Sequence, residues 1–243
     1  MKKANRVCVS EWHIRIKIKN ILQISLWLLK NKIYELSLDN KNIFSTKQPV
    51  ALQKSLWLGG KFMKTAVYVL DTKVLEDKET FASQYAKMMD YRKKRIDSYK
   101  DDNDKRLCLG TGILLSYALE KAGENEKELE YAKKESGMPY FKNKSDFYFS
   151  LSHSGERAMC AVSKNPIGCD VELLDDSNKD TVGWTKIESY AKATDTPLAY
   201  LMGNKGSMDS AYKFCGFERG DGYVYTVCSK EDITDDVLEI VSL

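Results

Sequence analysis

Residues 167–172 read IGCDVE and residues 184–192 read WTKIESYAK, and the two stretches have different periods. In the first, apolar residues alternate with small or acidic ones, which predicts a β-strand. Asp170 and Glu172 would then lie on one face of that strand, roughly 7 Å apart along the chain. In the second, the apolar residues recur at helical spacing and predict a helix. Strands and helices are therefore mixed, and we expect a fold of the α+β class.

Three acids and one lysine lie on these two elements. Glu188 and Lys192 are four residues apart and so are neighbours on a helix surface. Together with Asp170 and Glu172, Glu188 would supply the oxygen ligands that Mg²⁺ prefers, with waters and substrate phosphates completing the coordination. Lys192 could then meet phosphate charge directly. The simpler alternative is a strand with two solvated acids and an ordinary surface Glu–Lys pair.

The order of motifs along the chain favours the metal site. Four of them follow one another, namely Gly137-Met138-Pro139, Ser152-His153-Ser154, Gly168-x-Asp170-x-Glu172 and Trp184-x-x-x-Glu188-Ser189-x-x-Lys192. This order resembles the 4′-phosphopantetheinyl transferase superfamily, in particular its broad-specificity, surfactin-synthetase-activating type. The resemblance reaches back to Lys94 and Arg106 and covers roughly residues 63–243.

The resemblance implies a Mg²⁺-dependent enzyme that transfers the 4′-phosphopantetheine arm of coenzyme A to a serine of an apo acyl or peptidyl carrier protein and releases 3′,5′-ADP. Such enzymes serve fatty acid, polyketide or nonribosomal peptide biosynthesis. The implied roles are metal binding by Asp170, Glu172 and Glu188, catalysis by Glu188 and Lys192, and coenzyme A binding by Lys94, Arg106, Ser152 and His153. Glu188 would act as the base, directly or through a metal-bound water.

The resemblance also implies the architecture and the setting. We expect two similar α/β halves related by a pseudo-twofold axis, residues 63–165 and residues 166–243, with the metal site in the second half. The implied partners are coenzyme A and a carrier protein, without nucleic acid and without stable membrane insertion. The implied protein is a monomer in the cytoplasm. Six cysteines without metal-ligand spacing agree with a reducing compartment.

The chain departs from the family pattern at three places. The segment 173–183 is shorter than the usual insert, and Met138 and Ile187 stand where lysines are usual. Fewer lysines mean fewer phosphate contacts, so an alternative is a non-catalytic coenzyme A-binding relic of the family. A serine hydrolase is disfavoured, because no Gly-x-Ser-x-Gly elbow surrounds Ser152 or Ser154.

Periodicity and turn residues predict the remaining elements. The expected strands are 64–70, 146–152, 157–163, 167–173, 223–228 and 238–241, and the expected helices are 79–94, 104–119 and 183–194.

The first quarter of the chain differs in composition. Residues 1–62 contain 12 Lys or Arg and 3 acids, whereas the remainder contains 26 Lys or Arg and 32 acids. The apolar run at 21–29 is too short to span a bilayer. A basic helix on a membrane surface is one alternative. We expect instead that this basic extension is disordered or results from a mis-assigned start, with Met63 as the natural first residue, because Gly59-Gly60 can encode a ribosome-binding site.

Overall fold

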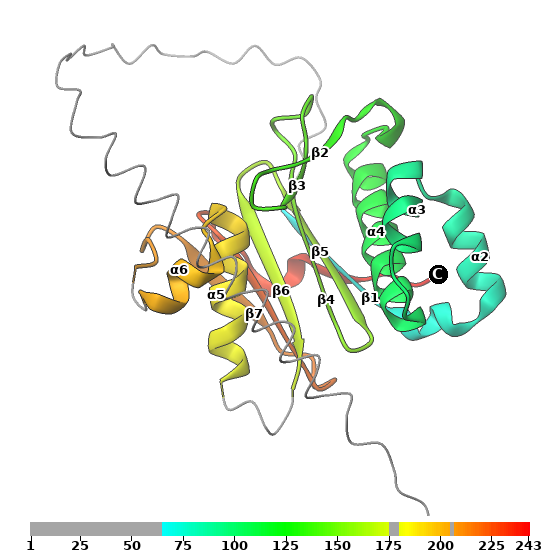
Figure 1. Cartoon of the computed structure of the whole chain (residues 1–243). Coiled ribbons are helices and arrows are strands. Elements are labelled where there is room, and N and C mark those ends of the chain that lie inside the picture. The colour runs from blue at the N-terminus through cyan, green and yellow to red at the C-terminus, as the bar shows by residue number, and fades with distance from the viewer. Residues whose placement is uncertain (1–64, 175–179, 205–206) are drawn as a thin grey trace, which may run out of the picture. The chain divides into compact units, whose positions relative to one another are not determined.

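The structure is a computed structural model that describes residues 65–174, 180–204 and 207–243 (Figure 1). They belong to one compact unit, residues 59–243. The expectations about residues 1–62 and about a start at Met63 lie outside the described residues. So do residues 175–179 in the middle of the short segment 173–183.

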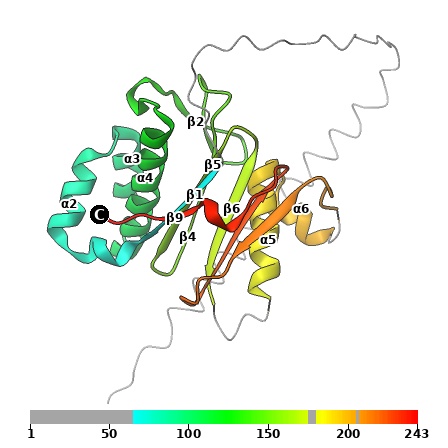
Figure 2. The ribbon, with the colours of Figure 1, turned by 180° about the vertical axis from the view of Figure 1, so that it is seen from behind.

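A four-stranded sheet with the order β4-β5-β1-β9 forms the first half of the fold. Its strands are β1 (Ala66–Asp71), β4 (Tyr148–Ser154), β5 (Arg157–Ser163) and β9 (Leu238–Ile240). β5 is antiparallel to both β1 and β4, while β9 is parallel to β1. The last strand of the chain thus lies beside the first described strand, as Figure 2 shows from behind.

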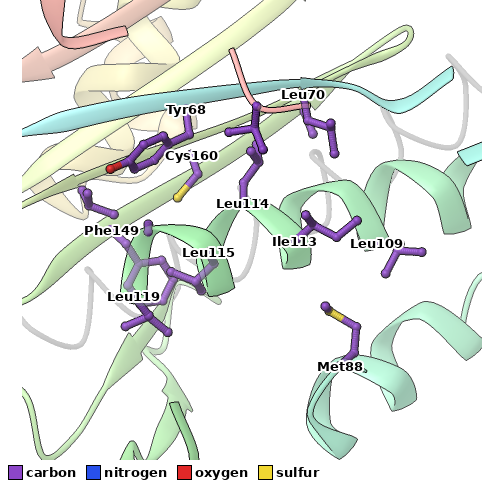
Figure 3. Close-up of a cluster of buried hydrophobic side chains, with 14 of the residues drawn as sticks. Tyr68, Leu70, Met88, Leu109, Ile113, Leu114, Leu115, Leu119, Phe149 and Cys160 are labelled. Carbon is purple, nitrogen blue, oxygen red and sulfur yellow. The ribbon is translucent and has the colours of Figure 1, made fainter. Parts of the chain in front are cut away.

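Helices cover the outer face of this sheet. They are α2 (Lys78–Lys87), α3 (Asp90–Asp97) and the long α4 (Asp102–Ala122), with short 3₁₀ turns at Thr72–Glu76, Glu126–Glu128 and Asp235–Val237. The Asp101 side chain caps the first turn of α4. Gly123 ends the helix at φ +78°, a conformation that glycine adopts without strain. Leu109, Leu114 and Leu119 of α4 are buried in one core cluster, in which Leu114 points toward the sheet and Leu109 toward Met88 (Figure 3).

The helix expected over residues 79–94 is in fact two helices. Met88 and Met89 between them have extended backbone, with ψ of 147° and 151°. The break lets Met88 enter the core and lets the buried Arg92 of α3 reach α4, where its guanidinium donates to the Gly112 carbonyl. Arg92 also pairs with Glu126 at 2.5 Å. Tertiary contacts therefore override the helical propensity of this stretch.

A three-stranded antiparallel sheet with the order β6-β8-β7 forms the second half. Its strands are β6 (Ile167–Leu173), β7 (Lys213–Phe217) and β8 (Tyr223–Ser229), and its helices are α5 (Thr181–Thr194) and α6 (Leu198–Gly203). One face of this sheet packs on the first sheet, through residues such as Val69, Met159 and Val171. α5 covers the other face. The layers are α4, first sheet, second sheet and α5, which confirms the α+β class, while the pseudo-twofold relation stays a prediction.

A small hairpin lies between α4 and β4 along the chain. It consists of β2 (Tyr131–Lys133) and β3 (Pro139–Phe141), which pair antiparallel. Its turn is closed by hydrogen bonds between Lys134 and Met138 and from Gly137 to Lys134, and Gly137 has a φ of +90°. None of the helices in the described ranges is long and apolar enough to cross a bilayer.

The contact between β6 and α5 depends on Gly168. A Cβ atom at this position would lie 1.9 Å from the Ser189 carbonyl oxygen of α5. We therefore expect Gly168→Ala to lower the free energy of unfolding by about 3 kcal/mol, because the helix must move off the strand. Chemical denaturation measures the effect. Gly216→Ala on β7 is the control, since its Cβ would lie 3.9 Å from the Tyr225 carbonyl oxygen, an ordinary contact. Equal effects of the two substitutions would contradict the direct contact at Gly168.

Candidate active site

A partly buried lysine–carboxylate cluster lies where β6, α5 and β4 meet. Lys192 Nζ on α5 is 2.6 Å from Asp170 Oδ1 on β6 and 3.4 Å from Glu188 Oε2, one turn back along α5. The Asp170 side chain is only 1% exposed. Ser152 Oγ on β4 donates to Asp170 Oδ1 at 2.6 Å and accepts from Lys192 at 3.1 Å. The structure thus brings together four of the residues that the sequence singles out.

Serines on β4 join the two sheets at this cluster. β4 and β6 are neighbours but belong to different sheets, so side chains connect them instead of a backbone ladder. Ser150 Oγ accepts from the Cys169 amide at 2.9 Å. Ser154 Oγ donates to Glu172 Oε2 at 2.8 Å and accepts from the Leu173 amide at 3.2 Å. The hydroxyls of Ser152 and Ser154 therefore orient the two acids of β6.

The carboxylates repel one another. Burial, and then the charges of Asp170 and Glu172, raise the pKa of Glu188 to about 7, although Lys192 counteracts part of this shift. Burial and Asp170 also raise the pKa of Glu172, against the hydrogen bond from Ser154. Burial alone would lower the pKa of Lys192, but Asp170 and Glu188 outweigh burial and raise it. Because a single lysine faces three acids, the cluster keeps an excess of negative charge.

Two features of the cluster bear on whether it could bind a divalent cation. Asp170 Oδ2 is buried and has no hydrogen-bond partner, and the acids around it carry excess negative charge. Carboxylate oxygens are the ligands that Mg²⁺ prefers. In the ranges that the structure describes, however, no three acidic, histidine or cysteine side chains are grouped as metal ligands. The carboxylate oxygens therefore fit a cation in their chemistry. In this structure Asp170 Oδ1 pairs with Lys192 instead.

The raised pKa of Glu188 predicts a pH-dependent stability of the protein in EDTA. Between pH 4.5 and about 7 the folded state keeps a proton that the unfolded state has released, so stability is present at low pH and lost as the pH rises through this window. Denaturation at several pH values should show this decline, and Glu188→Gln should make it shallower. Equal pH profiles for the two proteins would show that Glu188 titrates normally.

The residues expected to bind coenzyme A are more dispersed. His153 lies between Ser152 and Ser154, which contact β6, so its side chain points to the opposite face of β4. The His153 imidazole is exposed to solvent, yet desolvation by the surrounding protein and the charge of Lys192 lower its pKa. Arg106 on α4 contacts Asn103 at 3.2 Å and Glu76 at 3.7 Å. Both contacts lie away from the lysine–carboxylate cluster.

Three residues near these sites did not follow from the motifs. Asp104 and Arg95 both act on the pKa of His153, so their charges lie near the imidazole. Lys94, the expected ligand, is exposed on the same helix as Arg95. The basic run at 93–95 signals a cationic helix face but does not say which member faces His153. Ser154 is part of the quoted motif, but only the structure shows that its hydroxyl contacts Glu172.

A pocket of about 290 Å³ adjoins the cluster. Its lining comes from the β2–β3 turn, from β4 and from α5, and consists of Ser136, Gly137, Met138, Pro139, Phe149, Ser150, Leu151 and Lys192. Most of these side chains are apolar or carry a hydroxyl, and Lys192 is the cation among them. The pocket therefore suits an uncharged part of a ligand whose anionic group reaches Lys192.

Comparisons with known proteins agree with the motif order. The chain is 30% identical over 76 residues to a 4′-phosphopantetheinyl transferase of Bacillus subtilis, over 31% of this chain and 34% of that protein. It is 30% identical over 69 residues to 4′-phosphopantetheinyl transferase gsp of Aneurinibacillus migulanus, over 28% of each chain. It is 28% identical over 74 residues to 4′-phosphopantetheinyl transferase Sfp of Bacillus subtilis strain 168, over 30% of this chain and 33% of that protein.

These matches span about a third of the length of the curated relatives. No family model matches the chain. The resemblance to Sfp-like 4′-phosphopantetheinyl transferases is nevertheless confirmed, because all of the curated matches carry this name.

Proposed function

We propose that this chain transfers the 4′-phosphopantetheine arm of coenzyme A to a serine hydroxyl of an apo acyl or peptidyl carrier protein. The observation that carries the proposal is the partly buried cluster in which Lys192 contacts both Asp170 and Glu188. The cluster adjoins a pocket, and it lies on the sequence motifs whose order resembles the family that the relatives are named for. Coenzyme A is the donor in this reaction, and 3′,5′-ADP is the product that leaves.

The reaction is a phosphoryl transfer, and its difficulty is electrostatic. The serine oxygen attacks the phosphorus that bears the pantetheine arm, the bond to the bridging pyrophosphate oxygen breaks, and 3′,5′-ADP departs with the electron pair. Cations that face the departing phosphate stabilise this transition state. Lys192 would neutralise charge on the leaving side, because its ammonium is held between Asp170 and Glu188 at the pocket wall.

Glu188 would take the serine proton. Without a bound cation, burial and the neighbouring acids raise its pKa to about 7, which is close to the optimum for a base that works near neutral pH. The proton then resides on the Glu188 carboxyl group.

Asp170, Glu172 and Glu188 would hold Mg²⁺ when it binds, with the unpartnered Asp170 Oδ2 as the first ligand available. The ion would add positive charge beside the pyrophosphate. Hydrogen bonds from Ser152 and Ser154 orient Asp170 and Glu172 for this role.

Lys94, Arg106, Ser152 and His153 would bind the phosphates of coenzyme A. The lowered pKa of His153 favours the neutral imidazole at neutral pH, so His153 would act as a hydrogen-bond donor and not as a cation. We further propose that the protein is a monomer in the cytoplasm and that it acts on carrier proteins and not on nucleic acid.

The test is a mass measurement. Purified protein with coenzyme A and Mg²⁺ is incubated with several apo-carrier proteins, and each carrier is weighed intact. We expect a gain of one phosphopantetheine group on at least one carrier, and no gain when its acceptor serine is replaced by alanine. Coenzyme A binding without any mass gain would favour the non-catalytic relic.

A further inference from the structure

The end of helix α5 has an unusual backbone. Asp195 follows the last residue of α5 and has a φ of +59°, and it is the one non-glycine residue with positive φ in the ranges 65–174, 180–204 and 207–243. Glycine is the usual residue at this position, because a side chain strains the left-handed conformation. A carboxylate is also unfavourable next to the C-terminus of a helix, where the helix dipole is negative. Backbone strain and the helix dipole therefore both make Asp195 unfavourable for the stability of the fold at this position.

The Asp195 carboxylate joins α5 to the turn of the β2–β3 hairpin. Ser136 Oγ donates to Asp195 Oδ1 at 2.5 Å. Lys134 Nζ lies 3.5 Å from Asp195 Oδ2. Figure 1 shows this turn beside the C-terminal end of α5. Both carboxylate oxygens therefore contact a turn that lies about 60 residues earlier in the sequence.

The same turn is a wall of the pocket. Ser136, Gly137, Met138 and Pro139 line it from the hairpin side, and Lys192 lines it from α5, three residues before Asp195. Hydrogen bonds within the turn close it but do not tie it to α5, so its position relative to Lys192 depends on contacts with that helix. Asp195 supplies such contacts, to Ser136 and Lys134.

We propose that Asp195 is a positioning residue, which fixes the turn 134–139 against α5 and thereby sets the width of the pocket beside Lys192. This inference rests on the proposed function for its ligand, coenzyme A, an uncharged part of which would lie between the turn and β4. The contact with Ser136 offsets the two penalties at Asp195. Loss of the contact widens the pocket and weakens coenzyme A binding.

The decisive variant is Asp195→Gly, because glycine removes the contact and also relieves the backbone strain. Its Tm should equal or exceed that of the wild type. Its Kd for coenzyme A, measured by calorimetry, should rise about five-fold, the effect of one lost hydrogen bond. The loss should appear in KM for coenzyme A more than in kcat. Asp195→Asn keeps an acceptor for Ser136 and should bind nearly as well as the wild type, since an exposed ion pair contributes little.

Hydrogen exchange gives a readout that does not depend on the ligand. In Asp195→Gly and in Ser136→Ala the amides of Lys134 and Gly137 should exchange faster than in the wild type, while those of β8 should not change. Unchanged exchange in the turn, or an unchanged Kd where the wild type binds coenzyme A, overturns the role of Asp195. If the wild type itself does not bind coenzyme A, the proposed function fails, and hydrogen exchange alone decides whether Asp195 holds the turn.

Discussion

Asp170→Asn should lower kcat/KM for carrier modification by about 1000-fold, because it removes the negative charge that positions the cations acting on the reacting phosphate. Asparagine has the shape of aspartate and can still accept from Ser152, so the fold should persist. What it lacks is the charge that holds Lys192 at 2.6 Å and that would bind Mg²⁺. Initial rates from intact-mass kinetics measure the effect, with circular dichroism as the check on folding.

The matched control for this substitution is Asp232→Asn. Asp232 also pairs with a lysine, Lys213, but its side chain is 81% exposed. The control protein should keep the activity of the wild type, because exposed ion pairs contribute little. A folded Asp170→Asn protein with nearly normal activity would refute both the metal assignment and the electrostatic role of the cluster.

Lys192→Met should lower kcat by about 100-fold or more, because methionine keeps the apolar stem but not the ammonium. It should lower the affinity for coenzyme A less, since the lysine acts on charge that grows toward the transition state. Equal losses in both quantities would make Lys192 a simple binding contact. Lys87→Met, at the exposed end of α2, is the control for a lost surface charge.

Measurements of unfolding free energy distinguish the structural role of Lys192, as the partner of Asp170, from its catalytic role. The single variant leaves Asp170 buried without its charged partner, and it should lose about 3 kcal/mol of unfolding free energy. Adding Asp170→Asn removes the unpaired charge and should restore most of that stability, but none of the activity. A double variant as unstable as Lys192→Met would show that the pair is not coupled as the structure indicates.

Local periodicity accounts for the parts of the fold that the sequence predicted. The strand expected at 157–163 is β5, and the helix expected at 183–194 is α5, which begins two residues earlier at Thr181. The expectation of one helix over 79–94 was wrong, because Arg92 docks α3 separately onto α4. β7 was missed, since Lys213–Phe217 is a short edge strand with weak alternation.

The acidic residues of the candidate site were predictable from the sequence, but the side chains that orient them were not. Alternation along β6 places Asp170 and Glu172 on one face, and helical spacing places Lys192 beside Glu188. The hydroxyls of Ser152 and Ser154 reach these acids only because β4 and β6 meet from different sheets. Such a contact depends on how the sheets pack, and no period in the sequence encodes it.

The pairing of β9 with β1 bears on how the chain folds as it is synthesised. Tyr68 aligns with Glu239, and the Val241 amide donates to the Val69 carbonyl at 2.9 Å. Until β9 has left the ribosome, β1 is an open edge strand that can pair with another nascent chain. Contacts between such distant segments form slowly, since a long loop must close first. Synthesis of β9 is therefore the step that covers this edge of the sheet.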